Sequence, residues 1–160
     1  MARVARQARA RWGLLLFGIV LSAAAWGLPQ NAAADPRATI SVKVIHAKLG
    51  PPYLHEELKP LWDTLKKTFG ERFAFFDLLD KREGTVDVEG AVRLTMPDGD
   101  TFAAIYGGVT PDKGLVRVSV EYGEFRTKVR IHSGGMFFQA GKQFRAGTIV
   151  VAIKATIEKN

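Results

Sequence analysis

The sequence predicts an α+β fold: one amphipathic helix packed on a mostly antiparallel sheet, or on a small sandwich or open barrel, of seven to eight strands. Three observations lead to this prediction. Segments with apolar residues at every second position recur along residues 38–157, which is typical of half-buried strands. Residues 53–69 instead have helical spacing. Glycine- and proline-rich turns separate the later segments, as in a β-meander.

A strand, a helix and a second strand open the predicted domain. Residues 38–49 (ATISVKVIHAKL) alternate and are rich in β-branched side chains, so they favour a strand. Residues 53–69 place six apolar side chains on one helical stripe, although Pro60 predicts a kink or a restart there. Residues 72–80 (RFAFFDLLD) are apolar on both faces, as in a central strand.

The predicted meander follows, and its clearest part is a hairpin. Residues 86–96 and 101–106 form one strand pair around a Pro-Asp-Gly turn. Residues 115–122 and 125–132 flank the two-residue loop Gly123-Glu124, whose glycine-first order suits a hairpin turn. This loop fixes a register in which Tyr122 opposes Phe125.

The last segments complete the predicted sheet. Residues 136–139 form a short strand, residues 140–147 (AGKQFRAG) a basic loop bounded by glycines, and residues 148–157 the final strand. The first and last strands lack proline and contain few charged residues. If either lies at a sheet edge, we expect it to pair with another chain.

Residues 1–34 have the order of a secretory signal peptide. Four arginines precede an apolar run from Trp12 to Leu28, and three alanines end at Ala34, before Asp35. This order predicts export by the general secretory route and cleavage between Ala34 and Asp35. The alternative is an uncleaved inner-membrane anchor, although the run contains several Gly and Ala and is at the short end for a membrane span.

Composition limits what residues 35–160 do. The leader holds four of the 23 basic residues and none of the 16 acidic ones, so the remainder carries 19 − 16 = +3 and forms a single predicted domain. This charge does not indicate nucleic acid as a partner. The chain has no cysteine, which excludes disulfides and thiolate metal sites.

The predicted hairpin places basic side chains on one face. We identify five candidates for an anion- or partner-binding face, with Lys142 or Arg145 nearby: Arg117, Arg126, Lys128, Arg130 and His132. Outside the cytoplasm the partner would be an acidic lipid headgroup, polysaccharide or protein. The alternative is a solvated face that is partly neutralised by Glu121 and contributes little to binding.

We find no catalytic or metal-binding motif. The chain lacks Gly-x-Ser-x-Gly, a phosphate-binding glycine loop and the His-Glu-x-x-His pattern. His46, His55 and His132 are interpreted as ordinary core or surface residues. We therefore expect no enzyme activity, no cofactor and no metal.

The layout resembles an uncharacterised family of small exported β-rich proteins of Gram-negative bacteria. The resemblance depends on the leader, the unit from Ile40 to Leu79, the Met-Pro-Asp-Gly turn at 96–99 and the segment Gly-Thr-Ile-Val-Val-Ala-Ile at 147–153. It implies a periplasmic or secreted protein and assigns no activity or site.

These observations lead to three functional hypotheses, the last of which is a hydrolase without a recognisable sequence motif. The first is a non-catalytic binding or assembly module of the cell envelope that acts through a sheet edge or the basic face. Its partner would be an envelope protein or an anionic envelope component, without nucleic acid and without membrane insertion after cleavage. The second is a carrier or sensor of a small apolar or anionic ligand held between helix and sheet.

Overall fold

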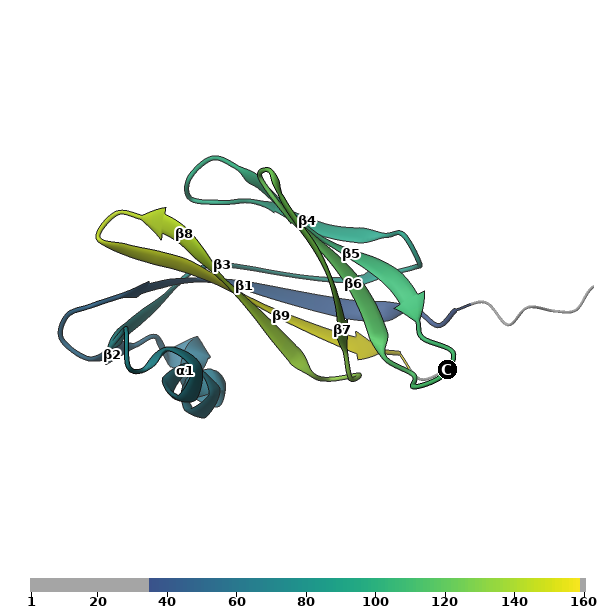
Figure 1. The fold of residues 1–160 in the computed structure, drawn as a ribbon, viewed down its shortest axis with the longest axis horizontal. Coiled ribbons are helices and arrows are strands. Elements are labelled where there is room, and N and C mark those ends of the chain that lie inside the picture. The colour runs from purple at the N-terminus through teal and green to yellow at the C-terminus, as the bar shows by residue number, and fades with distance from the viewer. Residues whose placement is uncertain (1–34, 159–160) are drawn as a thin grey trace, which may run out of the picture. The chain divides into compact units, whose positions relative to one another are not determined.

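The computed structural model describes residues 35–158, which form two β-sheets and one helical segment (Figure 1). Sheet A has the order β2-β3-β1-β9-β8 and sheet B the order β4-β5-β6-β7. Neighbouring strands are antiparallel except β2 and β3, which are parallel. The strands of sheet A are β1 (Ala38–Lys48), β2 (Tyr53–Leu54), β3 (Phe75–Val86), β8 (Met136–Phe144) and β9 (Gly147–Ile157). Those of sheet B are β4 (Ala91–Thr95), β5 (Thr101–Val109), β6 (Val116–Tyr122) and β7 (Phe125–Ile131).

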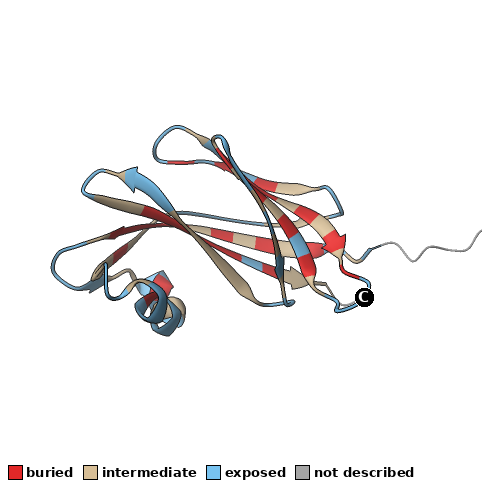
Figure 2. Ribbon diagram, viewed as in Figure 1, coloured by how far each residue is buried: buried red, intermediate tan, exposed pale blue. Residues whose placement is uncertain are grey.

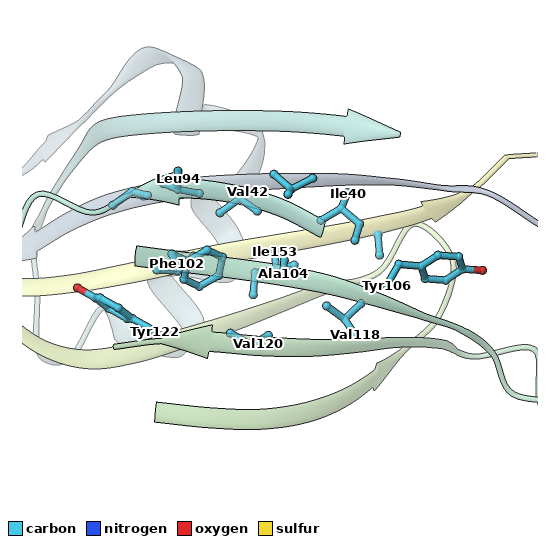
Figure 3. Packing of buried hydrophobic residues seen from close by; sticks show 14 of the residues in the cluster. Ile40, Val42, Leu94, Phe102, Ala104, Tyr106, Val118, Val120, Tyr122 and Ile153 are labelled. Carbon is cyan, nitrogen blue, oxygen red and sulfur yellow. The ribbon is translucent and has the colours of Figure 1, made fainter. Parts of the chain in front are cut away.

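The main core lies between the two sheets. Strand alternation sends every second residue of β1, β5 and β6 to the inner face, where these side chains are almost entirely excluded from solvent (Figure 3). Ile40 and Val42 of β1 thus face the same core as Phe102 and Val120 of sheet B. Of the predicted alternatives, the described residues have two packed sheets rather than a single sheet, and they contain nine strands rather than seven to eight.

A helical segment covers the outer face of sheet A. It consists of a 3-10 helix, η1 (Glu56–Leu61), followed by α1 (Trp62–Phe69). Leu58 and Leu65 are fully buried in a second apolar cluster, which also contains Phe76 of β3 and Val150 of β9. The break predicted at Pro60 is confirmed, because Pro60 lies in the 3-10 turn and the α-helix begins after it. Among the described residues, no helix is long and apolar enough to cross a bilayer.

The first and last long strands do not lie at the edges of sheet A. β1 pairs with β3 and β9, and β9 pairs with β1 and β8, so the first and last long strands both lie inside the sheet. The condition for the predicted pairing with another chain, an edge position of either strand, is therefore not met. A burial map shows the result, with buried residues concentrated along β1 and β9 and exposed residues frequent along β7 (Figure 2).

Three strands continue well past their predicted ends, and one of them is β5, which ends at Val109 rather than at residue 106. β3 continues to Val86 through a charged stretch, because its backbone pairs with β1 along its full length apart from a bulge near Leu79. β8 runs through the predicted loop 140–147, where Gly141 forms a bulge and the turn itself contains only Arg145 and Ala146. Arg145 has a φ of +51°, which matches the left-handed backbone that such tight turns require.

The hairpin of β6 and β7 has the predicted register. Tyr122 pairs with Phe125 and Val118 with Val129. Gly123 has a φ of +57°, in keeping with a glycine-first turn. Residues 1–34, which include the predicted leader and Ala34, lie outside the described residues, whereas Asp35 on the other side of the predicted cleavage site is exposed.

Candidate functional site

The outer face of sheet B carries a basic surface that no helix or strand of the described chain covers. The hairpin register brings four of the five predicted residues to this face, and all four are exposed: Arg117, Arg126, Lys128 and Arg130. We call them the basic face.

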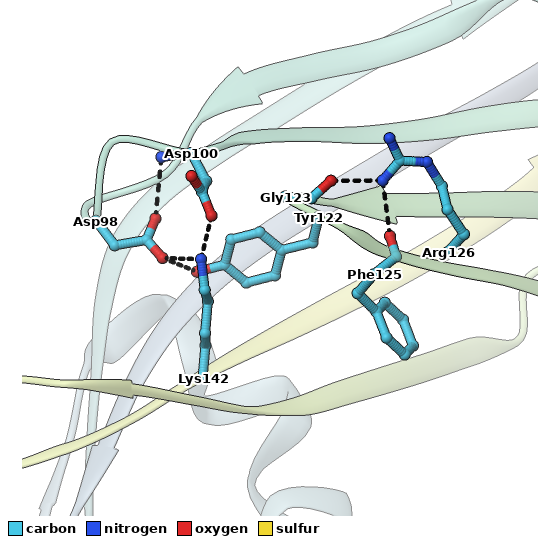
Figure 4. Close-up of polar contacts among 7 residues, drawn as sticks. All are labelled: Asp98, Asp100, Tyr122, Gly123, Phe125, Arg126 and Lys142. Atoms are coloured by element: carbon cyan, nitrogen blue, oxygen red, sulfur yellow. Dashed lines mark hydrogen bonds and ion pairs between the residues drawn. The ribbon is translucent and has the colours of Figure 1, made fainter.

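The cations of the basic face are not equivalent. Arg126 is held in place, since its Nε lies 3.2 Å from Glu121 Oε1 and its Nη1 donates to the carbonyl oxygens of Gly123 and Phe125 (Figure 4). Lys128 lies opposite Ser119, and Arg130 lies opposite Arg117. Within residues 35–158, Lys128 and Arg130 form no ion pair. Like charges directly opposite each other on a sheet destabilise it, and the Asp35 carboxylate near Arg117 offsets only part of this repulsion.

A bulge in β5 shapes the surface beside Arg117. Gly107 and Gly108 together oppose Arg117 on β6, and Gly108 has a φ of +84°. A side chain at Gly108 would collide with the Asp35 carboxylate and the Arg117 guanidinium. The absence of side chains here contributes to a hollow of about 710 Å³ whose lining includes Gly107, Ser119 and the cations Arg117, Lys128 and Arg130.

Sequence reasoning missed one further cation of this face. Arg93 of β4 pairs with Ala103 of β5 and is exposed on the same outer surface. The signal was present in the alternation of residues 91–95, where Val92 and Leu94 point inward. Arg93 therefore extends the positive potential across the sheet to its far edge.

Three residues that the sequence associated with the basic face lie elsewhere. His132 follows β7 in an exposed turn, where its carbonyl oxygen accepts from Gly135 N. Arg145 lies in the β8–β9 turn, 5.0 Å from the centre of the Phe144 ring. Lys142 of β8 bonds to the β4–β5 turn instead.

That contact of Lys142 joins the two sheets, and we call it the clasp. The Lys142 ammonium lies 2.8 Å from Asp98 Oδ2 and also bonds to Asp100, and Tyr122 OH donates to Asp98 Oδ2 at 2.9 Å (Figure 4). Burial raises the pKa of Asp98, but hydrogen bonds from Lys142 and Tyr122 outweigh it and lower that pKa below its ordinary value. Hydrogen bonds to Asp100 and Asp98 raise the pKa of Lys142.

A groove opens beside the clasp, between the first residues of β7 and the middle of β8. Its volume is about 700 Å³, and Tyr122, Phe125, Gln139 and Ile149 are among its lining residues. Tyr122 and Ile149 are core residues, whereas Phe125 is 43% exposed. The groove thus exposes part of the apolar interior between two strands that are not paired with each other.

His46 and His55 lie in other parts of the structure and have structural surroundings. His46 is buried between the rings of Phe75 and Phe144, and its Nε2 has no hydrogen-bond partner. His55 caps η1, accepting from Glu57 N at 3.3 Å. Among residues 35–158, no three histidine or carboxylate side chains gather as a metal site would require.

Comparison of the chain with protein families, curated proteins and solved structures found no match.

Proposed function

We propose that this domain is a non-catalytic binding module of the cell envelope that holds an anionic partner on the basic face of sheet B. The observation that carries the proposal is the cross-strand pair of Arg117 and Arg130 with Lys128 beside it, on an uncovered face. Such a cluster costs stability in the free protein. An anionic partner would offset that cost by neutralising the cations.

The surroundings of the cluster favour an anion with several charges. Arg117 and Arg130 line two neighbouring hollows, one shared with Lys128 and the other with the loop at residues 110–115. Arg93 adds a cation at the other edge of the sheet. A polymer or an acidic protein segment would contact these cations together, whereas a small monovalent anion would contact only one or two of them.

The second hypothesis, a ligand held between helix and sheet, receives less support. The space between α1 and sheet A is filled by fully buried side chains, including Leu58, Leu65 and Phe76. The hollow beside it measures about 240 Å³ and is lined partly by charged side chains such as Lys43 and Glu83. This is smaller than the cavities that usually hold small ligands.

The test compares two triple variants of the purified full-length protein for binding to poly-L-glutamate. The variant R117Q/K128Q/R130Q changes the basic face. The control variant K66Q/K67Q/R72Q removes the same charge from exposed positions around α1. Because exposed ion pairs contribute about 0.2–1 kcal/mol each, we expect the first variant to bind roughly 3- to 100-fold more weakly.

Salt dependence provides a second measurement in the same experiment. The affinity of the unchanged protein should fall steeply with salt, and the slope should be smaller for R117Q/K128Q/R130Q. Equal loss in both triple variants would mean that net charge alone drives binding, and the proposal would fail.

A further inference from the structure

Within the described chain, β7 is an edge strand of sheet B and pairs with a neighbouring strand on one side only. β7 pairs with β6, and its other neighbour in space, β8, belongs to sheet A. The two strands leave the turn at residues 132–135 in diverging directions (Figure 1). Within the described chain, the outer edge of β7 is therefore not part of any ladder, and it offers hydrogen-bonding groups to an added strand.

The register identifies which backbone N–H and C=O groups of β7 point away from β6. Phe125 closes the two-residue turn and directs its N–H and C=O toward Tyr122 of β6. Because this direction alternates along an antiparallel strand, the N–H and C=O of Arg126, Lys128 and Arg130 point away from β6. The residues with free backbone groups are thus the same residues whose side chains form the basic face.

We propose that an extended acidic peptide adds to β7 as a fifth strand of sheet B. This inference rests on the proposed function, since it names the kind of anionic partner. Residues of the added strand that lie opposite Lys128 and Arg130 share the outer face with them, so acidic side chains are favoured there. The intervening residues point inward, beside Phe125 and the groove floor of Tyr122 and Ile149, where apolar side chains are favoured.

The favoured occupant is therefore a segment with alternating acidic and apolar residues. Glu124 and Asp100 also line the groove, so acidic side chains are disfavoured at the inward positions of the added strand. A second copy of this chain fits poorly, because pairing β7 with another β7 sets cations against cations. The same side chains thus discourage self-association and select an acidic strand.

The other edges of the two sheets are less suited to strand addition. β2 contains two residues and β4 five. β8 is longer, but its ladder is interrupted by the bulge at Gly141, which weakens pairing at an edge. β7 has seven residues in continuous register.

The first experiment measures binding of fluorescent peptides to the purified full-length protein by anisotropy. The probe is Val-Glu-Val-Glu-Val-Glu-Val, and its control, Val-Val-Glu-Glu-Glu-Val-Val, has the same composition without alternation. Two further versions of the probe carry N-methyl groups, one on the glutamates and the other on the inner valines. We expect the probe to bind about tenfold more tightly than the control.

Only one of the two N-methylated peptides should bind about tenfold more weakly than the probe. The reason is that an added strand forms backbone hydrogen bonds to its neighbour only at alternate residues. A matched pair of protein variants tests the same point from the other side. K128Q removes the charge, whereas K128P also removes the outward N–H, at an edge position where proline is tolerated. Strand addition predicts that K128P binds the probe about tenfold more weakly than K128Q.

The outcomes separate this inference from the proposed function. If all peptides bind equally and poly-L-glutamate binding still depends on Arg117, Lys128 and Arg130, the basic face binds anions but strand addition is overturned. If neither the peptides nor poly-L-glutamate bind, both proposals fail. Dimers in sedimentation that K128P abolishes would assign the edge to a second copy and would also overturn the inference.

Discussion

The two sheets share one core but differ on their outer faces. Sheet A presents Ile45, Phe76 and Val150 outward, and these side chains are fully buried under η1 and α1. Sheet B presents Arg117, Lys128 and Arg130 outward, and all three are exposed. An apolar outer face must be covered by another element for stability, whereas a charged outer face can remain exposed to solvent. The helical segment therefore completes the core on sheet A, whereas the outer face of sheet B remains accessible to solvent.

The largest expected effect concerns the covered face. Phe76→Ala should lower the free energy of unfolding by about 3–5 kcal/mol, because it removes a fully buried ring between sheet A and α1. Ile105→Ala, on the outer face of sheet B, should cost much less, since Ile105 is only half-buried. Urea unfolding of both variants checks this difference. Equal losses would mean that the outer face of sheet B is covered in solution.

The next largest effect concerns the bulge that supports the basic face. Gly108→Ala and Gly99→Ala both place a side chain at a φ near +85°, with values of +84° and +88°. Each should lose about 1 kcal/mol of stability from backbone strain. At Gly99 nothing lies within 4 Å of the added Cβ, whereas at Gly108 it meets Arg117 and Asp35.

Only Gly108→Ala should therefore weaken binding to poly-L-glutamate, in addition to losing more stability than Gly99→Ala. Thermal unfolding and the binding assay measure the two effects separately. If both glycine variants bind as the unchanged protein does, the bulge does not position Arg117.

A smaller effect of opposite sign is expected on the bare face. Replacing Arg130 by Gln should raise stability by about 0.2–1 kcal/mol at low salt, because it removes the like charge opposite Arg117. The gain should shrink as salt screens the repulsion. Thermal unfolding at two salt concentrations tests this, with Lys67→Gln on α1 as the control. A loss of stability at low salt would show that Arg130 has a structural partner.

The smallest effect concerns the clasp and its dependence on pH. Hydrogen bonds from Lys142 and Tyr122 lower the pKa of Asp98 in the folded state below the value of 3.8 for a free side chain. The clasp therefore stabilises the fold fully above about pH 4, and this stabilisation is lost as the pH falls through the lowered pKa. Asp98→Asn should reduce stability at pH 7 and should flatten its fall below pH 4, as followed by urea unfolding. An equally steep fall in the variant would assign the acid sensitivity to other carboxylates.

Local chemistry made part of this structure predictable. The Gly123-Glu124 turn determines the register of β6 and β7, so the basic face followed directly from strand alternation. Pro60 marked the helix break for an equally local reason. In both cases the information lies within a few neighbouring residues.

The features that were missed depend on distant partners. The charged end of β3 is a strand because β1 provides its backbone bonds, which overrides the weak strand preference of residues 81–84. The clasp joins Asp98 to Lys142, which lie 44 positions apart in the sequence, and no sequence motif indicates this contact. The central positions of β1 and β9 likewise arise from pairing across the whole domain.

That pairing of β1 with β9 has a consequence for folding speed. Thr39 bonds to Glu158, 119 positions away along the chain, and Ala38 pairs with Ile157. Sheet A thus cannot form completely until its last strand is in place, so β1 keeps one edge unpaired until then. Long-range pairing of this kind slows folding into the millisecond-to-second range. During that interval the edge of β1 that later pairs with β9 is open to aggregation and to binding by a chaperone.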